Sequence, residues 1–146
     1  MMRPARPEEA AILAALTERA YAAYVPVIGR RPAPMDDDFP ARIAAGQAFV
    51  LERDSAVAAL AILEDAPGVL WVDNLAVDPA LHGQGIGQVL LAFAESEARR
   101  RGASEIRLFT HERMTRNIAI YARAGFEEYD RREEHGFRRV FMRRAL

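Results

Sequence analysis

The sequence predicts an α/β fold of the layered α+β type, with a single mixed, mostly antiparallel sheet of six or seven strands and about four flanking helices. Two observations predict it. Segments with apolar residues at helical spacing alternate with shorter runs rich in β-branched and aromatic residues. The 146 residues are 51% apolar and 28% charged, a composition typical of one globular core of ordinary size. We therefore expect a single domain over residues 1–146.

Four helices are expected, each bounded by residues that suit a helix end. Pro7, Glu8 and Glu9 suit the first turn of the first helix, because proline needs no amide partner there and carboxylates favour the positive helix end. Glycines follow the other three as end signals. The expected helices cover residues 6–24, 35–46, 86–101 and 114–125. The first has an apolar stripe at Ile12, Leu13, Leu16 and Ala20. The third has one at Ile86, Val89, Leu90, Phe93 and Ala94.

The strands are expected between turn signals. A tight turn at Asp54-Ser55 and another at His135-Gly136 each predict a hairpin. Residues 25–34, "VPVIGRRPAP", are broken by proline and glycine and are expected to form a loop. The expected strands cover residues 47–54, 55–65, 68–77, 104–110, 126–133 and 137–145, with a further strand within residues 2–6.

Charge and cysteine content exclude several classes of function. The formal net charge is −1, so charge alone favours neither a nucleic acid nor a membrane surface as partner. Arginines of the C-terminal "DRREEHGFRRVFMRRAL" alternate with glutamates and have few aromatic neighbours, which also argues against nucleic-acid binding. The chain has no cysteine, which excludes a disulfide, a thiolate metal site and a cysteine nucleophile. We expect no bound metal.

The N-terminal residues indicate no targeting segment. "MMRPARPEEA" lacks the apolar region of a signal peptide, and no run is expected to reach membrane-spanning length. A cytoplasmic protein without membrane contact is therefore expected.

The segment "LHGQGIG", residues 81–87, has the pattern of an anion site. It lies between a predicted strand and a predicted helix, where the first helical N–H groups lack intrahelical partners and the helix dipole is positive. Gly83, Gly85 and Gly87 keep side chains away, so that a phosphate can reach these amides. The spacing fits neither a P-loop nor Gly-x-Gly-x-x-Gly. A flexible glycine-rich turn is the alternative.

Two motifs resemble those of a known family. "LAVDPALHGQGIGQVLL" resembles the acetyl-coenzyme A signature of the GNAT superfamily of N-acetyltransferases, with His82 where the family usually carries glutamine or arginine. "NIAIYARAGFEE" resembles the family's downstream Asn…Tyr-x-x-x-Gly-Phe segment. Many members place the asparagine seven residues before the tyrosine, at Met114 here, whereas Asn117 lies four before Tyr121, on the same helix face. In architecture the resemblance spans roughly residues 2–146.

The resemblance implies acetyl-CoA as co-substrate and a primary amine of a small molecule or peptide as acceptor, joined by direct attack in a ternary complex. It implies that the pyrophosphate lies on the amides of the glycine loop and that the pantetheine arm runs beside residues 75–77 like an added strand. The implicated cofactor-binding residues are Leu75, Ala76, Val77, His82, Gly83, Gln84, Gly85, Ile86, Gly87, Gln88, Asn117 and Tyr121.

The chemistry requires a proton donor for the thiolate and a proton acceptor for the amine. Tyr121 is the candidate acid, because a phenol with a pKa of about 10 stays protonated at neutral pH and is close to an alkyl thiol. A half-buried core aromatic is the alternative role. Asp73 and Glu112 are candidate bases, and His82 and His111 are other titratable groups at strand or loop ends. Asp73 pairing with an arginine, His111 and Glu112 capping the following helix, or water acting alone are the alternatives.

The acceptor site is the least determined feature of the sequence. By resemblance it is built by the first two helices, their connection and the last hairpin, which implicates Tyr21, Tyr24, Val27, Ile28, Met35, Phe39 and Phe137. Asp36 to Asp38 at its rim suit a helix start better than a site for a cationic amine. Arginine-rich outer strands and exposed aromatics near the C-terminus favour a homodimer. A non-catalytic acyl-CoA-binding module of the same fold is the alternative function.

Overall fold

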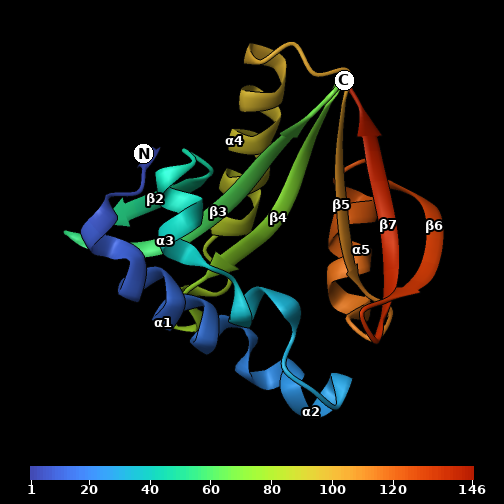
Figure 1. The fold of residues 1–146 in the computed structure, drawn as a ribbon, viewed down its shortest axis with the longest axis horizontal. Helices are drawn as coiled ribbons and strands as arrows, with labels where there is room; N and C mark the ends of the chain where they lie inside the picture. Colours follow the sequence, from blue (N-terminus) through green and yellow to red (C-terminus); the bar gives the residue numbers. More distant parts are fainter.

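The computed structural model describes all residues, 1–146, and confirms the predicted fold class (Figure 1). One seven-stranded sheet has the order β1-β2-β3-β4-β5-β7-β6, and only the β4–β5 pair is parallel. The strands are β1 Met2–Pro4, β2 Ala48–Arg53, β3 Ala56–Ala66, β4 Val69–Val77, β5 Glu105–His111, β6 Glu127–Glu134 and β7 Phe137–Ala145. The helices are α1 Ala10–Tyr21, α2 Val25–Ile28, α3 Phe39–Ala44, α4 Ile86–Arg100 and α5 Thr115–Arg123.

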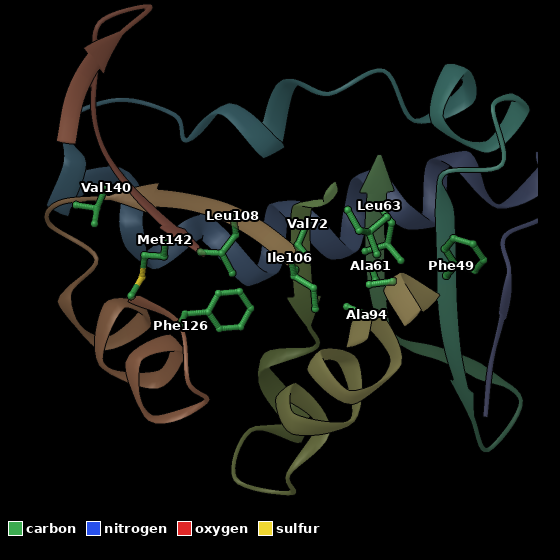
Figure 2. Packing of buried hydrophobic residues seen from close by; sticks show 12 residues of the cluster. Phe49, Ala61, Leu63, Val72, Ala94, Ile106, Leu108, Phe126, Val140 and Met142 are labelled. Atoms are coloured by element: carbon green, nitrogen blue, oxygen red, sulfur yellow. The ribbon is translucent and has the colours of Figure 1, made fainter. Parts of the chain in front are cut away.

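Helices cover both faces of the sheet. α1 and α3 cover one face of β2–β4, where Leu13, Leu16 and Phe39 pack on strand residues such as Ile62. α4 and α5 cover the other face, and Figure 2 shows Ala94 of α4 close to Ala61, with Phe126 beside Ile106. Small side chains on α4 let this helix approach the sheet closely, which fixes the position of the glycine loop that precedes it.

The buried stripes of the helices differ from the predicted ones. On α4 the buried residues are Ile86, Leu90, Ala94 and Ala98, four apart, whereas Val89 is 43% exposed. On α1, Leu13 and Leu16 are buried and Ile12 is 48% exposed. The predictions for Val89 and Ile12 are therefore wrong, whereas Phe93 of α4 and Ala20 of α1 are partly buried and pack against the core clusters as predicted.

The connection between α1 and α3 is more ordered than the predicted loop. It contains the short helix α2 and a 3-10 turn at Ala33–Asp36, and Gly29 ends α2 with a left-handed φ of 87°. Arg30 donates to the carbonyl of His135 at 3.2 Å, and Arg113 donates to the carbonyl of Val27 at 3.1 Å. These bonds tie the connection to the β6–β7 hairpin and to the segment after β5.

One expectation about membrane-spanning length is wrong. The helical run Pro7–Ile28 has 22 residues near the N-terminus and is long and apolar enough to qualify as a candidate span. In this fold Leu13 and Leu16 pack fully buried against the sheet, and Glu18 and Arg19 form ion pairs with Arg31 and Asp78. The α1 part of the run therefore packs one of its faces against the sheet.

Aromatic residues of the C-terminal hairpin are not exposed, contrary to the sequence-based expectation. Phe137 is 8% exposed and Phe141 is 2% exposed. The guanidinium of Arg132 lies 3.9 Å from the ring centroid of Phe141, and arginines stack over neighbouring rings in the same way. This part of the argument for a homodimer is therefore wrong, because the arginines cover the aromatic surface.

The sheet opens between β4 and β5. These strands pair only over Val69–Val72 and Glu105–Leu108, and Figure 1 shows them meeting near the C-terminus and separating toward α2. Beyond Val72, β4 still pairs with β3 as far as Val77, but its other edge has no partner strand. The opening exposes backbone groups and side chains of two strands to one cleft.

A β-bulge at Asp73 changes which face of the sheet each β4 residue occupies. Val72 pairs with Leu63 and Asn74 pairs with Ile62, so Asp73 is the extra residue. Leu70 and Val72 lie in the cluster under α4, whereas Ala76 lies in the cluster under α1. The bulge directs Asp73 and Asn74 toward the same side, that of α1 and α3.

Candidate functional site

Two adjoining pockets lie at the opening of the sheet. The glycine-loop pocket lies between the C-terminal half of β4, the start of α4, and α5. The bulge pocket lies between β4 and β5 and is walled by the α1–α3 connection and the β6–β7 hairpin. Tyr21, Leu75, Asn117 and Tyr121 line both pockets. A molecule in one pocket therefore faces a molecule in the other across these side chains.

The glycine loop forms a cradle for an anion. Gly83 and Gly85 have φ values of 82° and 76°, which only glycine adopts without strain, and Gly85 starts α4 without a side-chain cap. A Cβ at Gly83, Gly85 or Gly87 would meet no protein atom within 4 Å. The first amides of α4 are thus open to a ligand, and Arg116 supplies a cation to the same pocket.

Most of the predicted cofactor-binding residues line the glycine-loop pocket, but Gln84 and Gln88 do not. The pocket is lined by His82, Gly83, Gly85, Ile86 and Gly87, together with Leu75, Ala76, Val77, Asn117 and Tyr121. The side chain of Gln84 instead accepts a hydrogen bond from Arg53 Nη1 at 3.0 Å. Neither Gln84 nor Gln88 lines the pocket, so only their backbone amides remain candidates for contact with a ligand.

The free edge of β4 lies along the same pocket. Leu75 and Val77 pair with Ala61 and Ala59 of β3 on one side only. An unpaired strand edge offers N–H and C=O groups to an extended ligand, as in the addition of a strand to a sheet. This edge fits the pantetheine arm that the family resemblance implies there.

Tyr121 lies at the junction of the two pockets. It extends from α5, half-buried, and its ring packs edge-on against Phe126 with centroids 5.9 Å apart. Burial, together with the nearby Tyr24, raises the pKa of Tyr121 to about 12. The phenol is therefore fully protonated at neutral pH and is placed to donate a proton toward either pocket.

Asp73 and Asn74 bring polar groups to the bulge pocket. Tyr21 Oη donates to Asn74 Oδ1 at 2.9 Å, and Asn74 Nδ2 donates to Thr17 Oγ1 at 3.4 Å. Arg42 Nη1 donates to Asp73 Oδ2 at 2.9 Å. Burial raises the pKa of Asp73 to about 7, a neighbouring Glu64 adds to the rise, and Arg42 opposes it. A carboxyl that is half ionised near pH 7 is suited to accept a proton.

The other candidate base lies elsewhere. Glu112 forms an ion pair with Arg138 at 2.8 Å and lines neither pocket. His111 does line the bulge pocket, where its Nδ1 accepts from the backbone N–H of Arg113 at 3.1 Å. Burial lowers the pKa of His111, which favours the neutral imidazole. Of the carboxylates proposed from sequence, the structure brings only Asp73 to the site.

The residues proposed for the acceptor site are distributed unequally. Tyr21, Ile28 and Phe137 line the bulge pocket, and Tyr24 lines the glycine-loop pocket. Val27 lines neither pocket, and Met35 and Phe39 are buried outside both; Phe39 packs in the core with Leu13 and Leu16. The structure therefore does not place these three residues in the acceptor site, because Met35 and Phe39 are buried and Val27, which is 44% exposed, lies outside both pockets.

Of the three acidic residues before α3, Asp37 and Asp38 contact that helix, and Asp36 pairs within the preceding connection. Asp38 Oδ1 accepts from the backbone N–H of Ala41 at 3.1 Å as the N-cap. Asp37 pairs with Arg42 at 3.0 Å, and Asp36 pairs with Arg31 at 3.0 Å. This agrees with the helix-start interpretation of the segment.

Sequence reasoning missed several polar residues around the site, among them Arg42, Glu64, Asn74, Arg116 and Arg139. For Asn74 a signal exists: two adjacent polar residues interrupt the apolar strand "LWVDNLAV", which is what a bulge with two side chains on one face produces. Arg42 and Glu64 carry no such signal, because each alone is an ordinary charged residue.

Comparisons with known proteins agree with this geometry. The chain matches the family model described as the acetyltransferase (GNAT) family over residues 13–126. The [ribosomal protein bS18]-alanine N-acetyltransferase of Escherichia coli K12 is 32% identical over 80 residues, which are 55% of this chain and 54% of that protein. The same enzyme of Shigella flexneri matches equally. The chain thus spans about half the length of the curated relatives it matches.

Solved structures extend the likeness to the whole fold. The PaiA N-acetyltransferase of Thermoplasma acidophilum, in complex with coenzyme A, has a TM-score of 0.84 at 17% identity and covers 100% of this chain and 98% of its own. The ribosomal-protein-S18-alanine N-acetyltransferase of Escherichia coli has a TM-score of 0.78 at 21% identity, with 99% and 92% covered. At these identities the likeness establishes the fold.

Proposed function

Because the chain belongs to the GNAT family of acetyltransferases, we propose that it transfers the acetyl group of acetyl-CoA to a primary amine by direct attack in a ternary complex. The observation that carries the proposal is the shared wall of the two pockets. A donor in the glycine-loop pocket and an acceptor in the bulge pocket would meet at Tyr121, Asn117, Leu75 and Tyr21. Such proximity is a large part of what catalysis of a two-substrate reaction requires.

The donor side of the proposal rests on the open glycine loop. Gly83, Gly85 and Gly87 leave the amides at the start of α4 free of side chains, and Arg116 adds a positive charge, which supports binding of a pyrophosphate. The free β4 edge at Leu75–Val77 supports an extended pantetheine arm.

Three groups of the chain would then serve the chemistry. Acetyl-CoA supplies a thioester carbonyl that the amine attacks, with the CoA thiolate as leaving group. A β4 backbone N–H facing the carbonyl oxygen would stabilise the charge that develops there. Tyr121 Oη would protonate the sulfur, and the Asp73 carboxylate would accept the proton that the amine loses.

The acceptor proposed is a primary amine of a small molecule or a peptide, in a cytoplasmic setting. Apolar and aromatic side chains, including Ile28, Met114 and Phe137, line the bulge pocket, and Asp73 provides a negative charge within it. The relatives named for acting on the alanine of ribosomal protein bS18 make peptides that begin with alanine one class to test.

The proposal is tested by incubating the protein with acetyl-CoA and a panel of polyamines, arylalkylamines and alanine-initiated peptides. Release of free thiol should depend on one class of amine, and mass spectrometry should find the acetylated amine. If acetyl-CoA binds but no amine raises thiol release above hydrolysis, the chain is a non-catalytic acyl-CoA-binding module instead.

Gly87→Ala should weaken acetyl-CoA binding at least about tenfold without lowering stability. Gly87 is exposed in the first turn of α4, lacks a positive φ, and has open space at its Cβ, so alanine costs the free protein nothing and favours the helix. In the complex that methyl group would meet the phosphates. Calorimetry measures the Kd, and thermal unfolding measures stability.

Ser96→Ala is the matched control, because Ser96 is exposed on the same helix two turns farther along. It should bind acetyl-CoA as the wild type does. If the wild type and Gly87→Ala bind acetyl-CoA with equal affinity, the phosphates do not bind at the start of α4.

A further inference from the structure

A cluster of charged side chains connects the bulge pocket with the outer surface of the sheet. Arg42 of α3 lies at its centre and donates to Asp73 Oδ2 at 2.9 Å, to Glu64 Oε2 at 3.3 Å and to Gln47 Oε1 at 2.9 Å from the same Nη1 atom. Its Nε donates to Asp37 at 3.0 Å. Two carboxylates from adjacent strands, Asp73 of β4 and Glu64 of β3, therefore share one guanidinium nitrogen.

The two carboxylates differ in their access to the pocket and to solvent. The Asp73 side chain is 15% exposed and lines the bulge pocket. The Glu64 side chain is 49% exposed and lines neither pocket. The pair thus has one member inside the site and one member at the surface, with Arg42 holding both.

The charges of the cluster favour one proton on the pair. Asp73, Glu64 and Asp37 are three carboxylates around the single cation Arg42. Burial raises the pKa of Asp73, and a hydrogen bond with Asp73 lowers the pKa of Glu64. Both directions mean that, once the pair has taken up one proton, Asp73 holds it while Glu64 stays ionised.

We propose that Asp73 and Glu64, held together by Arg42, form the path by which the proton of the acceptor amine leaves the bulge pocket. This proposal rests on the proposed function. A proton passes from the ammonium nitrogen to Asp73, from Asp73 to Glu64 Oε, and from Glu64 to water, which restores the Asp73 carboxylate for the next turnover. Asp73 would touch the substrate, and Glu64 and Arg42 would act through it as positioning residues.

Other groups around Asp73 do not provide the same exit. Across the bulge pocket stand His111 of β5, Arg139 of β7, Tyr21 of α1 and Tyr121 of α5. Tyr21 and Tyr121 have raised pKa values through burial, and burial lowers the pKa of His111. Arginine cannot accept a proton. Asp37 also binds Arg42, but at Nε and with a side chain only 20% exposed, whereas Glu64 shares the Nη1 atom with Asp73 and is 49% exposed.

The first test follows the ionisation of Asp73 in the free protein by carboxyl ¹³C NMR. Glu64→Gln should move the Asp73 titration to lower pH by about one unit, because a neighbouring negative charge is removed. Arg42→Gln should move it to higher pH by a similar amount, whereas Arg42→Lys, which keeps the charge, should stay near the wild type. This readout needs no turnover, so it is independent of the proposed function.

The second test uses the acceptor found in the amine screen. In Glu64→Gln, turnover at high pH should fall by about threefold to tenfold and rise again with added imidazole, a small diffusible base that replaces the outer group. Asp65→Asn is the matched control: Asp65 is the next residue of β3, is 69% exposed, and pairs with Arg101 instead. It should show neither effect.

The outcomes separate the two proposals. Absence of opposite shifts in the NMR titrations would overturn the coupled pair, whatever the activity. Opposite shifts together with imidazole-independent turnover in Glu64→Gln would overturn the exit path. A wild type without amine-dependent turnover, but with both shifts, would instead count against the proposed function and so against the exit it serves.

Discussion

Tyr121→Phe should lower kcat about 100-fold or more while leaving the KM for acetyl-CoA nearly unchanged, the usual effect of removing a positioned acid. The change removes one hydroxyl at the junction of the two pockets and keeps the ring that packs on Phe126. Because the phosphate contacts proposed for the cofactor lie at the glycine loop, cofactor affinity should hold. Steady-state kinetics with the best amine, followed by thiol release, measures the effect.

Stability and pH dependence provide further checks on Tyr121. Loss of one hydroxyl should change the free energy of unfolding by no more than about 1 kcal/mol. Since burial raises the pKa of Tyr121 to about 12, ionisation of this tyrosine should cause no loss of activity in an assay between pH 6 and about 10.

Tyr129→Phe is the matched control for this prediction. Tyr129 lies on β6, outside both pockets, so its hydroxyl should not affect turnover. If Tyr121→Phe retains near-normal kcat, water supplies the proton and Tyr121 is a packing residue, even though the family assignment stands.

Asp73→Asn should lower kcat by about 100-fold or more above pH 7 and should remove the acidic limb of the pH profile. With a pKa of about 7, wild-type Asp73 becomes protonated as the pH falls below 7, and activity should fall with it. Asparagine keeps the shape and can still accept a hydrogen bond from Arg42, but it cannot take up the proton. The measurement is kcat against pH at saturating substrates.

Asp73→Asn should raise stability, although it lowers kcat. The pKa of Asp73 is about 7 in the folded protein and about 4 in an unfolded chain, so the folded state binds the proton more tightly. The contribution of Asp73 to stability should therefore decrease as the pH rises from about 4 to about 7. Asp73→Asn should gain stability relative to the wild type over this range, as measured by thermal unfolding at several pH values.

Asp65→Asn again serves as the control, because it removes an exposed charge from the neighbouring strand. An Asp73→Asn variant with an unchanged acidic limb would show that another group, or the amine itself, sets the pH dependence.

Local features of the site were determined by the sequence alone. Gly83, Gly85 and Gly87 leave the space around the first α4 amides open, as their spacing predicts, and the predicted hairpin turns have positive φ at Asp54, Ser55, His135 and Gly136. These features depend on the φ and ψ preferences of a few consecutive residues. The helical spacing that puts Asn117 and Tyr121 on one face of α5 is local in the same sense, and both residues line both pockets.

The tertiary structure decided what surrounds those local features. The bulge at Asp73 depends on the register between β3 and β4, and the sheet opening depends on how β4 and β5 pair, both of which are set by packing between distant segments. Arg42 reaches Asp73 across 31 positions of the chain. The same long-range packing sends Phe39 into the core and leaves Glu112 outside the site. Single-residue patterns record a side chain's chemistry but not its neighbours, because burial and register are properties of the whole fold.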